Sequence, residues 1–265
     1  SKVTNMTYMF YYCGSWSEVF TLDLGDKFDT SNVTDMSLMF YGCGKSYFTL
    51  DLGDKFDTSK VSTMEDMFYQ CKVSKLDLGD KFNTSNVTDM RHMFDACGYG
   101  SAEFTLNLGD NFDTSNVTNM SGMFSQCGYL SKVFTLDLGD KFDTSNVGGM
   151  ADMFAECGYS NEAFTLDLGD KFDTSKVTGM ADMFYECGYN SKVFTLDLGD
   201  KFDTSKVGGM RRMFYECGYS SEVFTLDLGD KFNTSKVYDL IGMSAMFYRC
   251  GYNSKVFTLD IGDKF

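Results

Sequence analysis

Apolar and polar residues alternate in the phrase FTLDL at residues 134–138. Alternation with a period of two predicts a β-strand with one buried face. We expect the Phe and both Leu of this phrase to point into a core, and Thr135 and Asp137 to face solvent. Gly139 follows at once and suits a turn that needs a positive φ.

A second pattern follows the strand. Val147, Met150, Met153, Phe154 and Cys157 fall at positions i, i+3, i+6, i+7 and i+10. This spacing is typical of one face of a short helix. The pattern therefore predicts a helix that starts near the first Met and ends at the glycine after the Cys.

Both patterns recur together at a fixed period of about thirty residues, as in the segments 134–163, 164–193 and 194–223. A fixed period in this range predicts a solenoid, in which each unit packs on its neighbours. Phe and Met occupy the same few positions of each repeat, which indicates stacked core ladders. We interpret residues 1–265 as one array and one domain.

These elements predict an α/β fold, a leucine-rich-repeat-like solenoid of about nine coils. Each coil would contain a strand, a turn, an extended loop and a short helix. The parallel sheet is expected on the concave side and the bulkier helices on the convex side. Because the chain starts and stops within a repeat, we expect it to be a segment of a longer protein.

The outward strand positions form the candidate partner-binding surface, a column of Thr beside a column of Asp. It comprises Thr21, Asp23, Thr49, Asp51, Thr105, Asn107, Thr135, Asp137, Thr165, Asp167, Thr195, Asp197, Thr225 and Asp227. An acidic concave face would suit a basic protein, a glycan or cations. A regular lattice of Thr also suits ice, and a solvated sheet face without a ligand is the remaining alternative.

The formal net charge is −15 and the isoelectric point is near 4.4. Such a balance argues against nucleic acid and anionic membrane surfaces, both of which need a basic footprint. No apolar run is long enough to span a bilayer. We therefore expect no nucleic-acid partner and no membrane insertion.

Nine Cys occur, one per repeat. An odd number at long spacing does not fit a zinc site, which uses close pairs. We interpret them as a ladder of buried thiols, with disulfides between adjacent coils as the alternative. Asp140 and Asp143 flank Lys141, and these carboxylates would either bind calcium or accept hydrogen bonds from turn backbone and cap the helix. The DLGDKFD phrase matches no calcium loop, so no metal and no cofactor is expected.

A longer phrase resembles a known family. It is Val33-Thr34-Asp35-Met36, followed by Met39-Phe40, Cys43 and Leu50-Asp51-Leu52. It resembles the FDTSNVTDMSxMFxxC repeats of mycoplasma surface lipoproteins and Gram-positive surface proteins, whose function is unknown. These repeats are in turn similar to BspA-like leucine-rich repeats. The resemblance implies a leucine-rich-repeat-like solenoid, an extracellular or cell-surface location, and an adhesive or scaffolding role.

No catalytic set stands out from the repeat background, and His92 is the only His. We therefore expect a structural or adhesive cell-surface repeat protein that is not an enzyme: a rigid stalk, a scaffold or a fibre component. The alternative is a binding module that uses the Thr/Asp face. Neither end resembles a polar cap, which leaves truncation, caps outside this segment, or end-to-end self-association into filaments as explanations.

Overall fold

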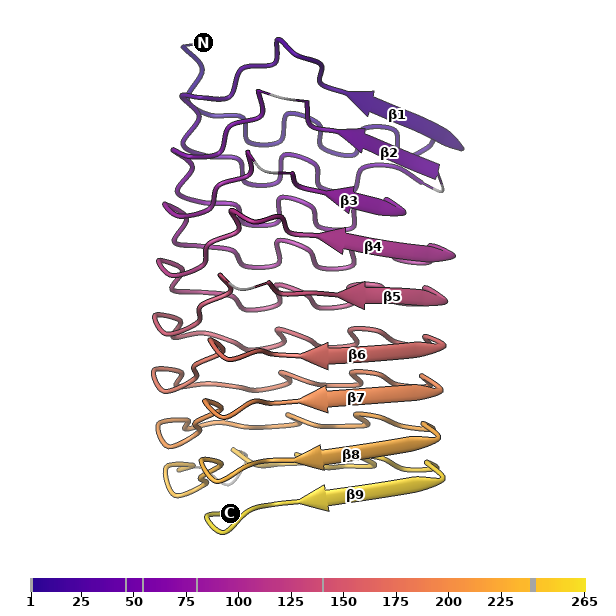
Figure 1. The fold of residues 1–265 in the computed structure, drawn as a ribbon, viewed down its shortest axis with the longest axis vertical. Helices are drawn as coiled ribbons and strands as arrows, with labels where there is room; N and C mark the ends of the chain where they lie inside the picture. Colours follow the sequence, from indigo (N-terminus) through magenta and orange to yellow (C-terminus); the bar gives the residue numbers. More distant parts are fainter. Residues whose placement is uncertain (1, 46, 54, 80, 140, 239–241) are drawn as a thin grey trace.

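The computed structural model describes residues 2–45, 47–53, 55–79, 81–139, 141–238 and 242–265. These residues form a parallel β-solenoid whose strands stack in one column, with β1 at one end and β9 at the other (Figure 1). The strands are β1 (Val19–Asp23), β2 (Tyr47–Asp51), β3 (Lys75–Asp77), β4 (Glu103–Asn107), β5 (Val133–Leu136), β6 (Ala163–Asp167), β7 (Val193–Asp197), β8 (Val223–Asp227) and β9 (Val256–Asp260). We name each coil after its strand, and a coil comprises the turn segment before the strand, the strand itself and the polar corner after it.

Within each sheet, neighbouring strands pair in parallel, with identical repeat positions side by side. Phe164 lies opposite Phe194 and Thr165 opposite Thr195. The pairs β1–β2 and β3 to β9 form two sheets, which a parallel bridge between Phe48 and Val73 connects. The predicted stacking of repeats in register is confirmed.

The predicted helices are wrong. Among the described residues the chain forms no α-helix, and the segment between each polar corner and the next strand is a run of consecutive turns. In the β4 coil, the N–H groups of Met93 and Cys97 donate to the carbonyls of Met90 and Phe94, three residues earlier. The N–H of Phe94 instead donates to Met123 in the next coil, at 2.9 Å. His92 and Ala96 likewise donate to Ser121 and Ser125 in the next coil, so alternate backbone donors of this segment hold neighbouring coils together.

Left-handed backbone at the turns explains the wrong prediction. His92 and Ala96 have φ of 52° and 53°, and they occupy the third position of turns that a positive φ at that position defines. Turns that repeat every three or four residues place side chains with nearly the spacing of a helix face. Because the described part of the chain forms no helix, the α/β class is wrong, and the concave sheet inferred from the bulk of the helices has no support.

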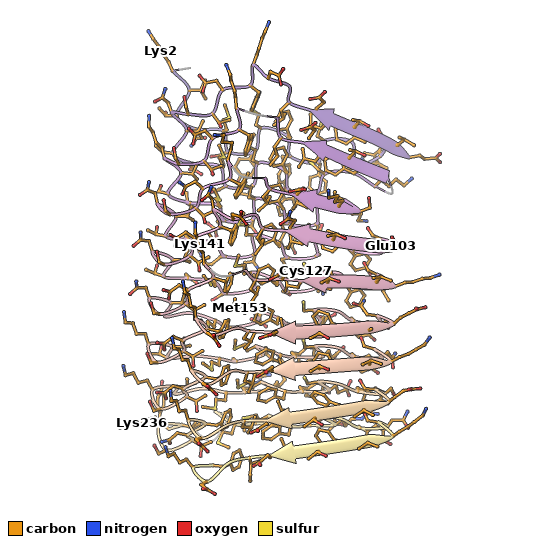
Figure 2. All side chains as sticks on the ribbon, viewed as in Figure 1. Lys2, Glu103, Cys127, Lys141, Met153 and Lys236 are labelled. Carbon is orange, nitrogen blue, oxygen red and sulfur yellow. The ribbon has the colours of Figure 1, made fainter. Side chains whose placement is uncertain are left out.

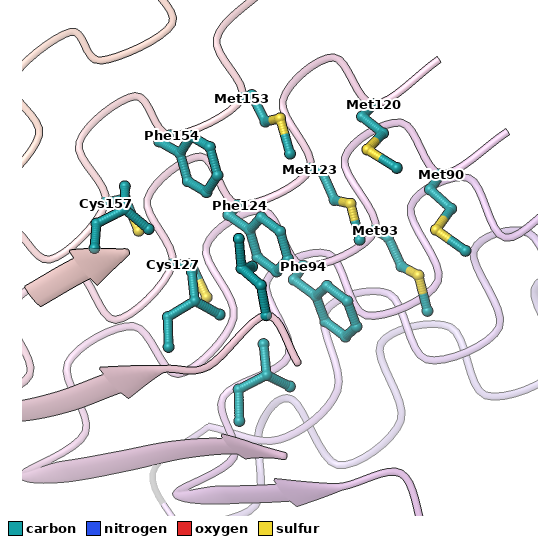
Figure 3. Close-up of a cluster of buried hydrophobic side chains, with 14 of the residues drawn as sticks. Met90, Met93, Phe94, Met120, Met123, Phe124, Cys127, Met153, Phe154 and Cys157 are labelled. Atoms are coloured by element: carbon teal, nitrogen blue, oxygen red, sulfur yellow. The ribbon is translucent and has the colours of Figure 1, made fainter. Parts of the chain in front are cut away.

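The core consists of stacked ladders of the predicted residues. Phe94, Phe124 and Phe154 lie in one row, with the methionines of the same coils beside them (Figure 3). The ring centroids of Phe94 and Phe124 are 5.6 Å apart, and the two ring planes are nearly parallel. All three Phe side chains are fully buried. Each coil therefore completes the core of its neighbour, which no single coil could form.

A ladder of buried Thr joins the polar corners. The Thr114 hydroxyl donates to the carbonyl of Asp143 at 2.9 Å and accepts from the N–H of the same residue at 2.7 Å. The carboxylate of Asp143 accepts from the N–H of Ser145 at 2.9 Å. This carboxylate therefore makes the expected local turn bond, but it caps no helix.

Candidate functional site

The predicted Thr/Asp surface lies on the outer face of the two sheets, where Lys75 of β3 takes the place of a Thr. Each of its predicted members is exposed, while Phe and Leu of the same strands point inward, as in β7. Thr21 lies opposite Thr49, Thr105 opposite Thr135, and Asp227 opposite Asp260. The structure thus brings the predicted residues together as two columns.

The Asp column has a structural role that the alternation alone does not reveal. Oδ1 of Asp137 accepts a hydrogen bond from the N–H of Gly139 at 2.9 Å. Asn107 makes the same bond to Gly109 at 3.0 Å. An acceptor side chain at this position closes a local Asx turn at the end of the strand. The position therefore needs an oxygen acceptor, but it does not need a charge.

A third outward column, formed by the first residue of each strand, was not among the predicted surface residues. Val133, Val193, Val223 and Val256 stand at the start of their strands and are about half exposed, between 50% and 53%. They lie two residues before the Thr column, at the strand position that Glu103 occupies in β4, which Figure 2 labels. A period of two also assigns these positions to the outer face, so the sequence carried the signal.

Shallow grooves run between adjacent strands on this face. One groove is lined by Thr135, Asp137, Thr165 and Asp167. A second type of groove separates successive corners and is lined by Gly109, Asp110, Phe112, Leu138, Gly139 and Lys141. Both repeat along the column, so the surface suits an extended ligand better than a single small molecule.

No three His, Cys, Asp or Glu side chains in the described ranges converge as a metal site would require. The nine cysteines are all free thiols, and all except Cys13 are buried. Burial raises the pKa of the Cys43 thiol to about 12, which disfavours the reactive thiolate. The buried-thiol interpretation is confirmed, and the disulfide alternative is wrong.

The turn segments carry carboxylates that the sequence analysis did not single out. Asp152 and Asp182 occupy the same left-handed position in adjacent coils, and Nε of Arg212 lies 2.7 Å from Oδ1 of Asp182. Burial, then the neighbouring Asp182, raises the pKa of Asp152. Glu186 occupies the next left-handed position of the coil that contains Asp182. Burial also raises the pKa of Glu186.

Tyrosines form surface stacks along the turn segments. In one column Tyr99, Tyr129, Tyr159, Tyr189, Tyr219 and Tyr252 stack in sequence, with centroid separations between 4.4 and 5.4 Å. The Arg249 guanidinium lies 5.0 Å from the centroid of Tyr219 and 4.7 Å from that of Tyr252. Within this column the faces of neighbouring rings cover one another, so the surface that it offers consists mainly of ring edges and hydroxyls.

His92 lies on a turn segment, not on the predicted helix. Its Nδ1 is 3.0 Å from Oδ2 of Asp95. The hydrogen bond with this carboxylate raises the pKa of His92. The side chain of Ser125 also hydrogen-bonds to the Asp95 carboxylate, and His92 and Asp95 form a local ion pair when the imidazole is protonated.

The repeated ladders and the stacked parallel strands define a β-solenoid repeat protein. The chain belongs to the family described as "Mycoplasma protein of unknown function, DUF285", whose model matches residues 1–104, 71–187, 98–218 and 131–260. The overlapping matches follow the repeats along the chain. No curated protein and no solved structure gives a significant match.

Among the described residues, no helix is long and apolar enough to cross a membrane.

Proposed function

We propose that this chain is a structural repeat protein without enzymatic activity, which acts as a rigid spacer or scaffold at the cell surface. The observation that carries the proposal is the in-register core: Phe, Met and Cys of each coil lie buried against the same residues of the next. Such a column keeps its two ends at a fixed separation. The surface location rests on the resemblance to surface-protein repeats.

Polar bonds between coils support rigidity. Thr174 bonds to both the carbonyl and the N–H of Asp203, and backbone bonds such as that from Phe184 to Met213 link the turn segments. Bending the column would lengthen the hydrogen bonds of several ladders at once. Solenoid length is then set by the number of coils.

A deletion tests the spacer. Removing residues 134–223 joins Val133 to Phe224 in the same repeat phase and takes out three repeats. Strands in a sheet are about 4.8 Å apart, so the folded column should shorten by about 14 Å. Small-angle X-ray scattering measures the length, and circular dichroism verifies the fold. A shortened chain that unfolds or becomes globular contradicts the proposal.

The surface location has its own test. In cells that make the protein, a protease added outside intact cells should degrade it, while a cytoplasmic control protein stays whole. Protection of the chain until lysis would contradict the location without affecting the spacer.

A second candidate function is binding of a basic partner along the Thr/Asp face, favoured by the exposed Asp column and its grooves. Polylysine is a suitable probe. A variant with Asp137→Asn, Asp167→Asn and Asp197→Asn removes three charges and keeps the turn bonds, as Asn107 does. If the Thr/Asp face binds polylysine, the affinity for polylysine should be lower in this variant than in the wild type. The affinity of the wild type should also fall as the salt concentration rises. Equal binding by both proteins contradicts the candidate.

A further inference from the structure

The repeat is interrupted in the interior of the array, between the β3 and β4 coils. Leu76 comes five residues after Cys71, whereas Leu106 comes nine residues after Cys97. The β3 coil therefore lacks the Gly-Tyr loop that follows the Cys in each later coil, and Lys72 stands directly after its Cys. One ring is consequently missing from the tyrosine column at this point.

Tyr99 is the first ring of that column and has one face without a stacked neighbour. It stacks on Tyr129 with the ring centroids 5.0 Å apart, and among the described residues no ring stacks on its other face. Nζ of Lys72 lies 5.8 Å from the Tyr99 centroid, which is close to the outer limit of a cation–π contact. In the described ranges no carboxylate forms an ion pair with Lys72. The Tyr99 side chain is 38% exposed.

A second gap lies beside this ring. Gln70, Ala96 and Gln126 occupy the same left-handed position in three successive coils, with φ of 53°, 53° and 52°. Each later coil carries Glu or Arg at this position, so the small Ala96 leaves a space between two amide side chains. These three residues, together with Lys72 and Tyr99, line a notch of about 160 Å³. Two separate departures from the repeat therefore open one hollow.

The amides beside the notch keep unused hydrogen-bonding capacity. Nε2 of Gln126 donates to Oε1 of Glu156 at 3.2 Å. The side chain of Gln70 hydrogen-bonds to the Tyr69 hydroxyl. A Gln amide has two N–H donors and a carbonyl oxygen with two lone pairs, so each Gln can still bond to a ligand. The notch thus combines an aromatic ring face, two amides and one cation.

Each of these groups selects a feature of the ligand. A Tyr ring face packs against a flat patch of C–H groups, Gln amides bond to hydroxyls, and the Lys ammonium attracts a carboxylate. Pockets for drug-sized molecules measure about 300–1,000 Å³, so the notch admits only a single small ring. A simple carboxylate would use the cation but would leave the ring and both amides without contacts.

From this constellation we infer that the notch binds one pyranose ring that carries a carboxylate, as in a hexuronic acid residue of an acidic glycan. The pyranose stacks on Tyr99 in place of the missing tyrosine. Its hydroxyls bond to Gln70 and Gln126, and its carboxylate draws the ammonium of Lys72 away from the ring. The notch lies on the turn segments and not on the Thr/Asp face, so the inference goes beyond the proposed function.

The test uses the full 265-residue chain and saturation-transfer NMR with methyl β-D-glucuronide. A contact of this size should bind the glucuronide with a Kd of about 1 mM. The axial C–H groups on one face of the pyranose should receive most saturation, because they would lie on the Tyr99 ring. Methyl β-D-glucoside, which lacks the carboxylate, should bind about 5-fold more weakly.

Two variants and a matched control locate the site. Ala96→Gln places in the notch the same side chain that Gln70 and Gln126 carry at this backbone position, and should abolish binding. Lys72→Met keeps most of the apolar stem and removes the charge, so it should weaken glucuronide binding about 5-fold, to the level of the glucoside. Lys75→Met removes one positive charge from the exposed sheet face and should bind as the wild type does. Circular dichroism verifies that each variant is folded.

Two groups of results would overturn the inference. The site is wrong if the wild type shows no saturation transfer, if Ala96→Gln binds as well as the wild type, or if Lys75→Met weakens binding as much as Lys72→Met. The acidic sugar is wrong if the two glycosides bind equally, or if N-acetylglutamate binds as well as the glucuronide. None of these results changes the length of the column in scattering, so the spacer is tested separately.

Discussion

At the residue scale, polar side chains decide how well the coils are joined. The buried Thr ladder is an example, because each hydroxyl both donates to and accepts from the backbone of the next coil. Thr114 is fully buried between its own corner and that of Asp143. The methyl group of Thr114 only packs against its neighbours. A conservative substitution can therefore measure the contribution of the hydroxyl alone.

Thr114→Val should destabilise the protein by about 1–3 kcal/mol, because it keeps the shape but leaves the N–H and carbonyl of Asp143 without partners. Thr114→Ser keeps the hydroxyl and should cost less. Urea unfolding of the two variants measures the difference. Equal losses would show that the hydroxyl bonds contribute nothing to holding the coils together.

Asp66 should make the stability of the fold depend on pH. Burial, the largest cause, raises the pKa of this carboxyl to about 6, while the nearby His92 opposes the shift. A raised folded-state pKa favours the protonated form in the native protein, so this group stabilises the fold below about pH 4 and loses that contribution as pH rises through 6.

Asp66→Asn should therefore raise the unfolding midpoint at pH 7 relative to wild type, with the advantage shrinking as pH falls from 7 to 4. The measurement is urea unfolding across this range. Asp51→Asn, on the exposed sheet face, is the control that removes one charge without burial. An Asp66→Asn advantage that is the same at all pH values would contradict the assignment.

At the element scale, the turn segment depends on left-handed positions. Gly122 has a φ of 65°, and a Cβ placed there would overlap the ring of His92 in the preceding coil. Gly179 has neither constraint: no atom lies within 4 Å of a Cβ added there, and Thr63 and Asp89 occupy the equivalent position in other coils. Other coils carry non-glycine residues such as His92 and Asp152 at the left-handed position of Gly122, so the two glycines compare the cost of that strained position with an unstrained one.

Gly122→Ala should lower stability by about 1–2 kcal/mol from left-handed strain alone, with the clash against His92 adding to it. Gly179→Ala should be neutral or slightly stabilising, because Ala lowers the entropy of the unfolded chain. Thermal unfolding followed by circular dichroism compares them. A neutral Gly122→Ala would show that the turn segment rearranges at low cost.

At the scale of the whole molecule, the core is a continuous stack of repeated ladders. Internal coils bury their thiols completely, as at Cys127 and Cys157, and burial raises the pKa of both. Reaction of an internal thiol then needs local unfolding. The end coil that contains Cys13 is the exception.

A thiol reagent such as DTNB, added to the folded protein, should therefore consume one thiol per chain quickly and the other eight slowly. Cys13→Ser should abolish the fast phase. Denaturant should merge the two phases, because it opens the column. Several fast thiols in the native protein would contradict the continuous buried ladder.

The sequence by itself determined the period, the strand, the side of each strand residue, and the identity of the core ladders. These follow from covalent spacing: alternate residues of an extended chain face opposite sides, and copies at a fixed period stack on one another. The Thr/Asp columns were predictable for the same reason.

Only the tertiary structure decided the turn segment. Apolar residues at spacings of three and four fit a helix or a run of turns equally well, and local pattern cannot separate them. The choice depends on where the backbone N–H groups find acceptors. In this chain, groups such as that of Phe94 bond to the neighbouring coil, a partner about thirty residues away that no local pattern contains.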